Sequence, residues 1–155
     1  MNSLRLALCV ATLVLAASAS GFETAQSTAA TGTIEYAFTP GDDAAGLVVR
    51  TIDAARAQVL VQAFSFTHRD IADALIRAHR RGLDVQIIAD REQSESTASA
   101  AMHTLINSGL PVYMDAEHSA AHNKVLVIDH GTSEPVLVTG SFNFKIGRAS
   151  CRERV

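Results

Sequence analysis

The residues of this chain best suited to chemistry lie near its C-terminal end. His122 and Lys124 are two residues apart in an apolar segment that ends at Asp129. Side chains two apart on a β-strand point to the same side, so the imidazole and the ammonium would project together, with Val125 and Val127 pointing into the opposite layer. An imidazole can attack phosphorus, and an ammonium can neutralise phosphate oxygens. The spacing therefore predicts a phosphodiester-cleaving site.

A second polar segment follows the next predicted strand. Gly140 permits a tight turn there, and Ser141 and Asn143 add neutral hydrogen-bond donors that could bind phosphate together with Lys124. The spacing H-x-K-x4-D arises by chance in about one chain in a hundred at ordinary residue frequencies, and the added G-S-x-N makes a chance match much rarer. The alternative is a strand histidine and lysine at a solvated edge.

Together the two segments resemble the HKD motif of the phospholipase D superfamily. The likeness continues upstream through residues 63–67, 70–71, 81–85 and 107–111. It covers residues 33–144 and is similar to the small bacterial endonucleases of this superfamily that carry a single motif. The resemblance implies His122, Lys124 and Asp129 as catalytic residues, a phosphohistidine intermediate, no metal and no cofactor.

The resemblance also implies a homodimer. In the superfamily a second histidine, from a second motif, protonates the leaving oxygen, and this chain has one motif only. His118 has no lysine two residues after it, so a surface loop position is expected. Two His122 residues would then meet across a two-fold axis, supplying nucleophile and general acid. Nucleic acid is the expected substrate, and a phospholipid is the alternative.

Two features depart from the family pattern. Ten residues separate Asp129 from Gly140, where the family usually has six; the extra residues fall in a turn, where insertions are tolerated. The family also continues past Asn143 with a helix, a strand, a closing helix and an acidic residue that orients the catalytic histidine. The chain as printed would lack them, so an inactive fragment is a third interpretation.

Strand and helix patterns alternate along the chain and would position these residues. They predict a mixed, largely parallel α/β sheet with helices on both faces, since helices between strands imply right-handed crossovers. The expected strands cover 33–38, 58–65, 84–89, 111–115, 122–129 and 136–139, and the expected helices cover 44–57, 67–81 and 94–108.

The two ends of the chain are predicted to lie outside this domain. Residues 1–19 have one positive charge, an apolar stretch too short for a membrane span of about 20 residues, and small residues before Ser20. We therefore expect a signal peptide and a periplasmic or secreted protein, with an uncleaved anchor as the alternative. Residues 20–32 read as a linker, and 33–145 as the domain. Residues 146–155 correspond to the translated start of a common sequencing adapter, which favours a non-native tail over a natural basic one.

Composition limits the remaining possibilities. Cys9 and Cys151 lie in the two excluded ends, so the expected domain has neither a disulfide nor thiol chemistry. Residues 20–145 contain 9 basic and 15 acidic residues, a net charge of −6. Such a domain has no general attraction for nucleic acid, so any polyanion site must be local. Arginines 69, 77, 80 and 81 could contact phosphate, but a solvated, paired helix face is the expected role.

Overall fold

The computed structural model describes residues 31–96 and 100–145. In chain order the elements are α1 (Ala44–Ala54), β1 (Gln58–Ala63), α2 (Arg69–Arg80), β2 (Asp84–Asp90), α3 (Arg91–Ser96), α4 (Ala100–Asn107), β3 (Val112–Asp115), β4 (Lys124–Ile128) and β5 (Val136–Thr139). The predicted signal peptide, most of the predicted linker and the tail at 146–155 lie outside the described residues.

The strands form one mixed sheet in the order β3-β2-β1-β4-β5. β1 pairs in parallel with β2, and β2 with β3, while β4 runs antiparallel to both β1 and β5. This arrangement confirms the predicted mixed α/β sheet. It also brings the C-terminal ends of β1 and β2 to the same edge as the start of β4.

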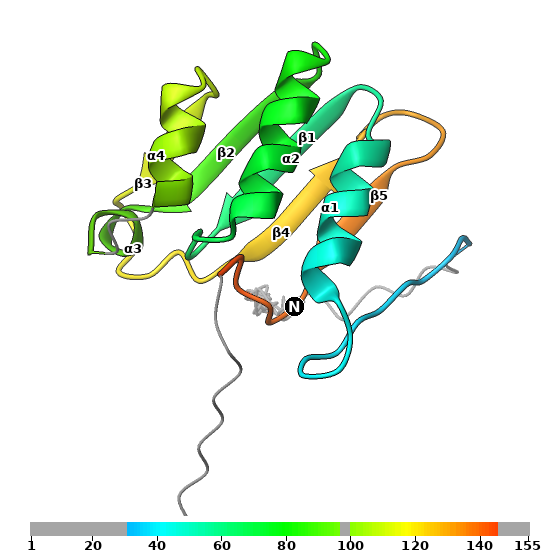
Figure 1. Ribbon diagram of the computed structural model, residues 1–155, viewed down its shortest axis with the longest axis horizontal. Helices are drawn as coiled ribbons and strands as arrows, with labels where there is room; N and C mark the ends of the chain where they lie inside the picture. Colours follow the sequence, from blue (N-terminus) through cyan, green and yellow to red (C-terminus); the bar gives the residue numbers. More distant parts are fainter. Residues whose placement is uncertain (1–30, 97–99, 146–155) are drawn as a thin grey trace, which may run out of the picture. The chain divides into compact units, whose positions relative to one another are not determined.

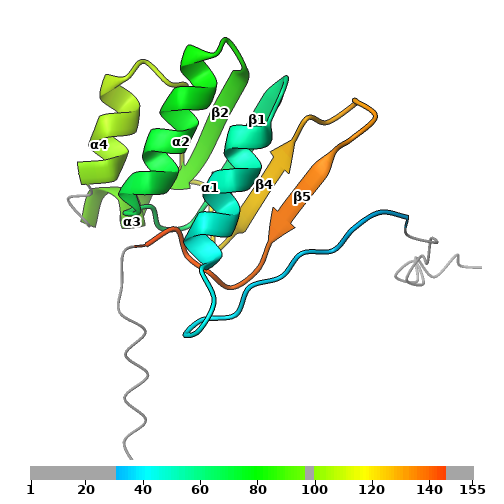
Figure 2. The same cartoon turned by 45° about the vertical axis from the view of Figure 1, so that its right-hand side comes forward.

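Helices α1, α2 and α4 lie over one face of the sheet (Figures 1 and 2). The chain moves from β1 to β2 to β3 in a single direction, and successive right-handed crossovers in one direction place their helices on the same side. The prediction placed helices on both faces; no helix among the described residues covers the second face.

The core lies between these helices and the sheet. Alternate residues of β1, β2 and β4 are buried against the helices, including Val59, Ile87 and Leu126, each no more than 1% exposed. Ile52 of α1 and Leu75 of α2 meet them and have no exposed surface. Burying such apolar side chains contributes about 1.5–3 kcal/mol each, which accounts for the strict alternation along the strands.

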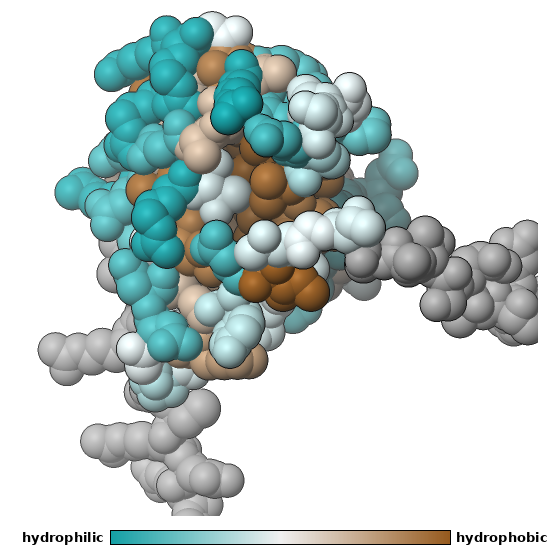
Figure 3. Space-filling model, turned by 90° about the vertical axis from the view of Figure 1, so that its right-hand side faces the viewer, coloured by the Kyte–Doolittle hydropathy of each residue, from teal (hydrophilic) through white to brown (hydrophobic). Residues whose placement is uncertain are grey.

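Apolar side chains stay accessible elsewhere on the sheet. Ile88 of β2, Tyr113 of β3 and Leu137 of β5 are 43%, 56% and 65% exposed. Figure 3 looks onto the β5 side and shows hydrophobic side chains gathered in the middle of that side. None of the helices within 31–96 and 100–145 has the length and apolar character of a membrane span.

Several predicted elements differ from those observed. The helix predicted over 44–57 ends at Ala54, and the strand predicted over 58–65 ends at Ala63. Residues 33–38 form no strand, and the described sheet consists of β1 to β5 without this segment. The helix predicted over 94–108 is two helices, α3 and α4, with residues 97–99 between them not described. The strand predicted from His122 begins at Lys124.

Candidate active site

The site is assembled where β1 ends and β4 begins. Lys124 lies opposite Ala63 in the antiparallel pairing of these strands. The backbone N–H of Phe64 donates to the carbonyl oxygen of Asn123 at 2.8 Å, which extends the pairing by one more bond. Residues 122–124 are therefore tied to the end of the central strand, although about 60 residues of chain separate the two segments.

His122 is exposed and lies just before β4. The N–H of Asn123 donates to the carbonyl of Ala121 at 2.8 Å, a local turn that keeps His122 out of the strand ladder. The imidazole packs edge-on against the ring of Phe64, with 4.3 Å between the ring centroids. No hydrogen bond to the imidazole is present among the described residues, so a ring nitrogen remains available for chemistry.

Lys124 is 6% exposed and faces the same side of β4 as Leu126. Its ammonium lies 5.0 Å from the centroid of Phe64 and donates to the carbonyl oxygen of His122 at 3.3 Å. Burial lowers the pKa of Lys124, and the nearby positive charge of Lys145 lowers it further. A poorly solvated cation beside an exposed imidazole is suited to receiving an anionic group.

The segment 140–143 returns to the same end of the sheet. Thr139 lies opposite Val125, so Gly140 follows at the level of Lys124. Phe144, further along, is bound to the segment that follows β1. Thr67 and His68 of that segment both donate backbone N–H groups to the carbonyl of Phe144, at 2.7 and 2.8 Å.

The predicted phosphate ligands on this segment differ in burial. Ser141 is exposed, whereas Asn143 is half-buried and its Oδ1 is buried with no hydrogen-bond partner in the described part of the chain. Most buried polar atoms in folded proteins are hydrogen-bonded, so this unpaired oxygen is unusual. It accepts hydrogen bonds, so only the NH₂ group of the same amide could donate to a phosphate oxygen.

Asp129 is not brought to this site. It lies past the other end of β4, about 17 Å from Lys124 at the usual rise per strand residue. Its buried carboxylate accepts backbone N–H groups from Arg56, Ala57 and Gln58, at distances between 2.7 and 3.1 Å. These bonds join β4 to the turn before β1, which is a structural task.

Two residues at the site were given no role by sequence reasoning. Phe64 touches both His122 and Lys124, as described above. Asp90, at the end of β2, is 2% exposed and accepts the backbone N–H of Ala121 at 2.8 Å and that of Gln93 at 2.8 Å. The position of Asp90 after a buried strand was the one available signal, because strand ends of a parallel sheet commonly carry functional groups.

Comparison with known proteins identifies the family of this chain. Residues 48–153 match the family described as "Cardiolipin synthase, PLD-like domain". The chain belongs to the phospholipase D-like family. The match includes every residue of the candidate site and all the described helices and strands except the first part of α1.

Several family members are similar to this chain. A phospholipase D of Rickettsia conorii is 33% identical over 72% of this chain, and a mitochondrial cardiolipin hydrolase of Chlamydomonas reinhardtii is 30% identical over 71%. The chain spans about half the length of these relatives, 53% and 46%.

Two solved structures share the fold. The phospholipase D family member Nuc from Salmonella typhimurium is 40% identical, with a TM-score of 0.63 over 69% of this chain and 68% of Nuc. NucT from Helicobacter pylori is 27% identical, with a TM-score of 0.54 over 65% of this chain and 67% of NucT.

Other polar groups of this phospholipase D-like domain form hydrogen bonds and ion pairs away from the candidate site. Arg77 binds both carboxylate oxygens of Asp53 on α1, the shorter contact being 2.8 Å, and Arg81 donates to the carbonyls of Ile52 and Ala55. These two arginines therefore join α2 to α1. The expected pairing lay within the helix, between Arg77 and Asp73, whereas the observed partner of Arg77 is Asp53. His118 is exposed, as predicted, and pairs with Asp115 at 3.0 Å.

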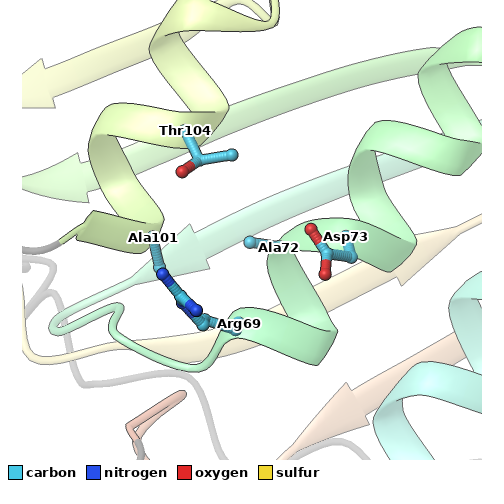
Figure 4. Close-up of a pocket in the computed structure, with 5 residues that line it drawn as sticks. All are labelled: Arg69, Ala72, Asp73, Ala101 and Thr104. Carbon is cyan, nitrogen blue, oxygen red and sulfur yellow. The ribbon is translucent and has the colours of Figure 1, made fainter.

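The pocket drawn in Figure 4 is not lined by His122. A pocket of about 230 Å³ lies between α2 and α4, where Arg69, Ala72 and Asp73 face Ala101 and Thr104 (Figure 4). It contains neither His122 nor Lys124. Within residues 31–96 and 100–145, no three His, Cys, Asp or Glu residues are grouped as metal ligands.

Proposed function

We propose that the complete gene product is a phosphodiesterase that hydrolyses nucleic acid through a phosphohistidine on His122. The observation that carries this proposal is the juxtaposition of an exposed imidazole and a buried ammonium on one aromatic ring, at the sheet edge where residues 140–143 return. Few other reactions need a nucleophilic imidazole beside a fixed positive charge with neutral donors around it.

The proposed reaction has two steps. A ring nitrogen of His122 attacks phosphorus, and the bond from phosphorus to the leaving oxygen breaks. Water then attacks the phosphorus and releases His122. Lys124 and the amide of Asn143 would hold the non-bridging oxygens, whose negative charge is most concentrated in the transition state.

A second imidazole is needed to protonate the leaving oxygen, because an alkoxide is a poor leaving group. The sequence contains a single H-x-K pattern, so we propose that His122 of a second copy supplies this proton within a homodimer. In the second step the second imidazole, which has given up its proton, would take a proton from the attacking water while the bond from His122 to phosphorus breaks.

Nucleic acid is favoured over lipid by sequence similarity. The chain resembles the single-motif endonucleases of the superfamily, and Nuc, at 40% identity, is more similar to it than the Rickettsia phospholipases D, at 33%. A phospholipid is the second candidate, because the curated relatives are named phospholipase D and cardiolipin hydrolase.

The test compares two substrates and one variant in the complete gene product. We expect cleavage of single-stranded and double-stranded DNA in the presence of EDTA, and little release of headgroup from phosphatidylcholine or cardiolipin vesicles. His122→Ala should lower DNA cleavage at least about a thousandfold while the circular dichroism spectrum is unchanged. A folded His122→Ala protein within tenfold of wild type would contradict the mechanism, and cleavage of lipid alone would contradict the substrate.

A further inference from the structure

His122 has an unusual position for a residue that must act with sub-ångström accuracy. It is exposed, it lies outside β4, and its imidazole has no hydrogen bond among the described residues. A misplacement of about 1 Å can cost a hundredfold in rate, so the position of the ring must be set by its neighbours. Two residues contact the chain around His122: Phe64, which directly follows β1, and Asp90, the last residue of β2.

Phe64 contacts it through its side chain and its backbone. The phenyl ring meets the imidazole edge-on, with planes inclined by 69° and centroids 4.3 Å apart, and it lies 5.0 Å from the ammonium of Lys124. The N–H of Phe64 also holds the carbonyl of Asn123. Edge-to-face aromatic contacts have a preferred geometry, so the ring restricts how the imidazole can turn.

Asp90 contacts it through the backbone only. One carboxylate oxygen accepts the N–H of Ala121, directly before His122, and the other accepts the N–H of Gln93 at the start of α3. Asp90 is 2% exposed and Ala121 is 5% exposed, so water cannot replace the bond between them. A buried hydrogen bond to a charged group is among the stronger ones available to a loop.

We propose that Phe64 and Asp90 are positioning residues that together fix His122 for attack, Asp90 by holding the backbone before it and Phe64 by holding its ring and the backbone after it. The inference rests on the proposed role of His122. Neither residue needs to touch the substrate. They act from the ends of neighbouring parallel strands, β1 and β2, which are rigid because both lie inside the sheet.

The first experiment replaces the ring in the complete gene product. Phe64→Leu keeps an apolar side chain of similar size but removes the aromatic edge contact, and should lower kcat about tenfold with KM within twofold. Phe64→Tyr keeps the ring and should stay within twofold of wild type in both. Phe38→Leu is the matched control, because Phe38 is exposed and lies outside the sheet, and it should change neither.

The same kinetics are measured on bis(p-nitrophenyl) phosphate, a diester without a nucleobase. The kcat loss in Phe64→Leu should persist on it, because the proposed defect lies in the enzyme and not in base contacts. A rise in KM with unchanged kcat, or a loss seen only with DNA, would mean that Phe64 contacts substrate and would overturn its positioning role.

The second experiment replaces one acceptor oxygen. Asp90→Asn should lower kcat about tenfold or more and speed amide hydrogen exchange of Ala121 by a similar factor, with Val61 in β1 still protected. Asp84→Asn is the control. Like Asp90, Asp84 accepts two hydrogen bonds, here from the side-chain amides of Gln58 and Gln86, but it lies at the opposite end of β2. Asp84→Asn should leave kcat and the exchange of Ala121 unchanged.

The outcomes separate this inference from the proposed function. If His122→Ala is inactive but folded Phe64→Leu and Asp90→Asn retain wild-type kcat, the positioning role is wrong and the function stands. If His122→Ala remains active, the proposed function itself is wrong. Because both residues are proposed to fix the position of the same residue, His122, the double variant should lose less activity than the product of the two single losses.

Discussion

Lys124 combines a buried position with a charge that the proposed chemistry requires. Its ammonium is withdrawn from water, and the compensation visible in the described residues is one backbone carbonyl and the face of Phe64. Desolvation disfavours the charged form, and Lys145 adds like-charge repulsion, so the pKa of Lys124 lies below that of an ordinary lysine. An anionic substrate would relieve both effects, which favours binding of a phosphate.

This lowered pKa gives a prediction for pH dependence. We expect kcat/KM to fall on the alkaline side at a pH below about 10.4, the ordinary lysine value, as the ammonium loses its proton. The folded state binds this proton more weakly than the unfolded state, so stability should rise with pH over the same window. Activity and stability should thus change in opposite directions, as pH-rate profiles and urea unfolding can measure.

Lys124→Met is the control for both measurements. It should be nearly inactive and should lack this rise in stability at alkaline pH. If the kcat/KM of the wild type falls only at or above the ordinary lysine value, the pKa of Lys124 is not lowered in the folded protein.

At the scale of elements, the two ends of β4 have different tasks. Its first residue belongs to the candidate site, while Asp129 beyond its last residue connects it to the turn between α1 and β1. Asp129 has a positive φ of 53°, and its carboxylate reaches three successive N–H groups there. Burial would raise the pKa of Asp129, but the three backbone hydrogen bonds hold it below its usual range.

We predict that Asp129→Asn lowers the free energy of unfolding by about 2 kcal/mol at pH 7, because the amide NH₂ would face backbone donors. Asparagine tolerates positive φ, so backbone strain does not confound the result. The contribution of Asp129 is present above about pH 3.9 and is lost as the pH falls through its lower folded-state pKa. The difference between wild type and variant should therefore shrink in urea unfolding at pH 3.

The control is Asp73→Asn on the exposed side of α2, which should change stability by less than about 0.5 kcal/mol. An Asp129→Asn protein as stable as wild type at pH 7 would contradict the structural role of this carboxylate.

At the scale of the molecule, the proposed mechanism needs two imidazoles, whereas the sequence contains a single H-x-K pattern. A two-fold dimer would place two copies of the same edge together, and each catalytic centre would then use a His122 from both subunits. Heterodimers of wild-type and His122→Ala subunits would lack either the nucleophile or the acid.

Subunit mixing tests this arrangement. When wild-type and His122→Ala chains of the complete gene product are co-expressed in equal amounts with different tags, total activity should fall to about one quarter, since only wild-type homodimers are active. Independent subunits would retain about one half. Size-exclusion chromatography with light scattering provides the matching measurement of mass.

The sequence by itself determined the elements that depend on local pattern. Strand patterns over 58–65 and 84–89 predicted β1 and β2, and the helical stripe with Ile71 and Leu75 predicted α2, because burial of one face imposes a period on the chain. The H-x-K spacing likewise singled out His122 and Lys124, since the two residues are neighbours in sequence.

Only the tertiary structure decided which distant groups meet. Asp90 and Ala121 are 31 positions apart, and Phe64 reaches His122 only because β4 pairs antiparallel with β1. The same pairing carries Asp129 away from the site, although it is part of the same motif. Segment 33–38 has a strand-like composition but no strand, because a strand also requires a partner. Contacts of this kind depend on which strands are neighbours in the sheet, and a local sequence pattern does not contain that order.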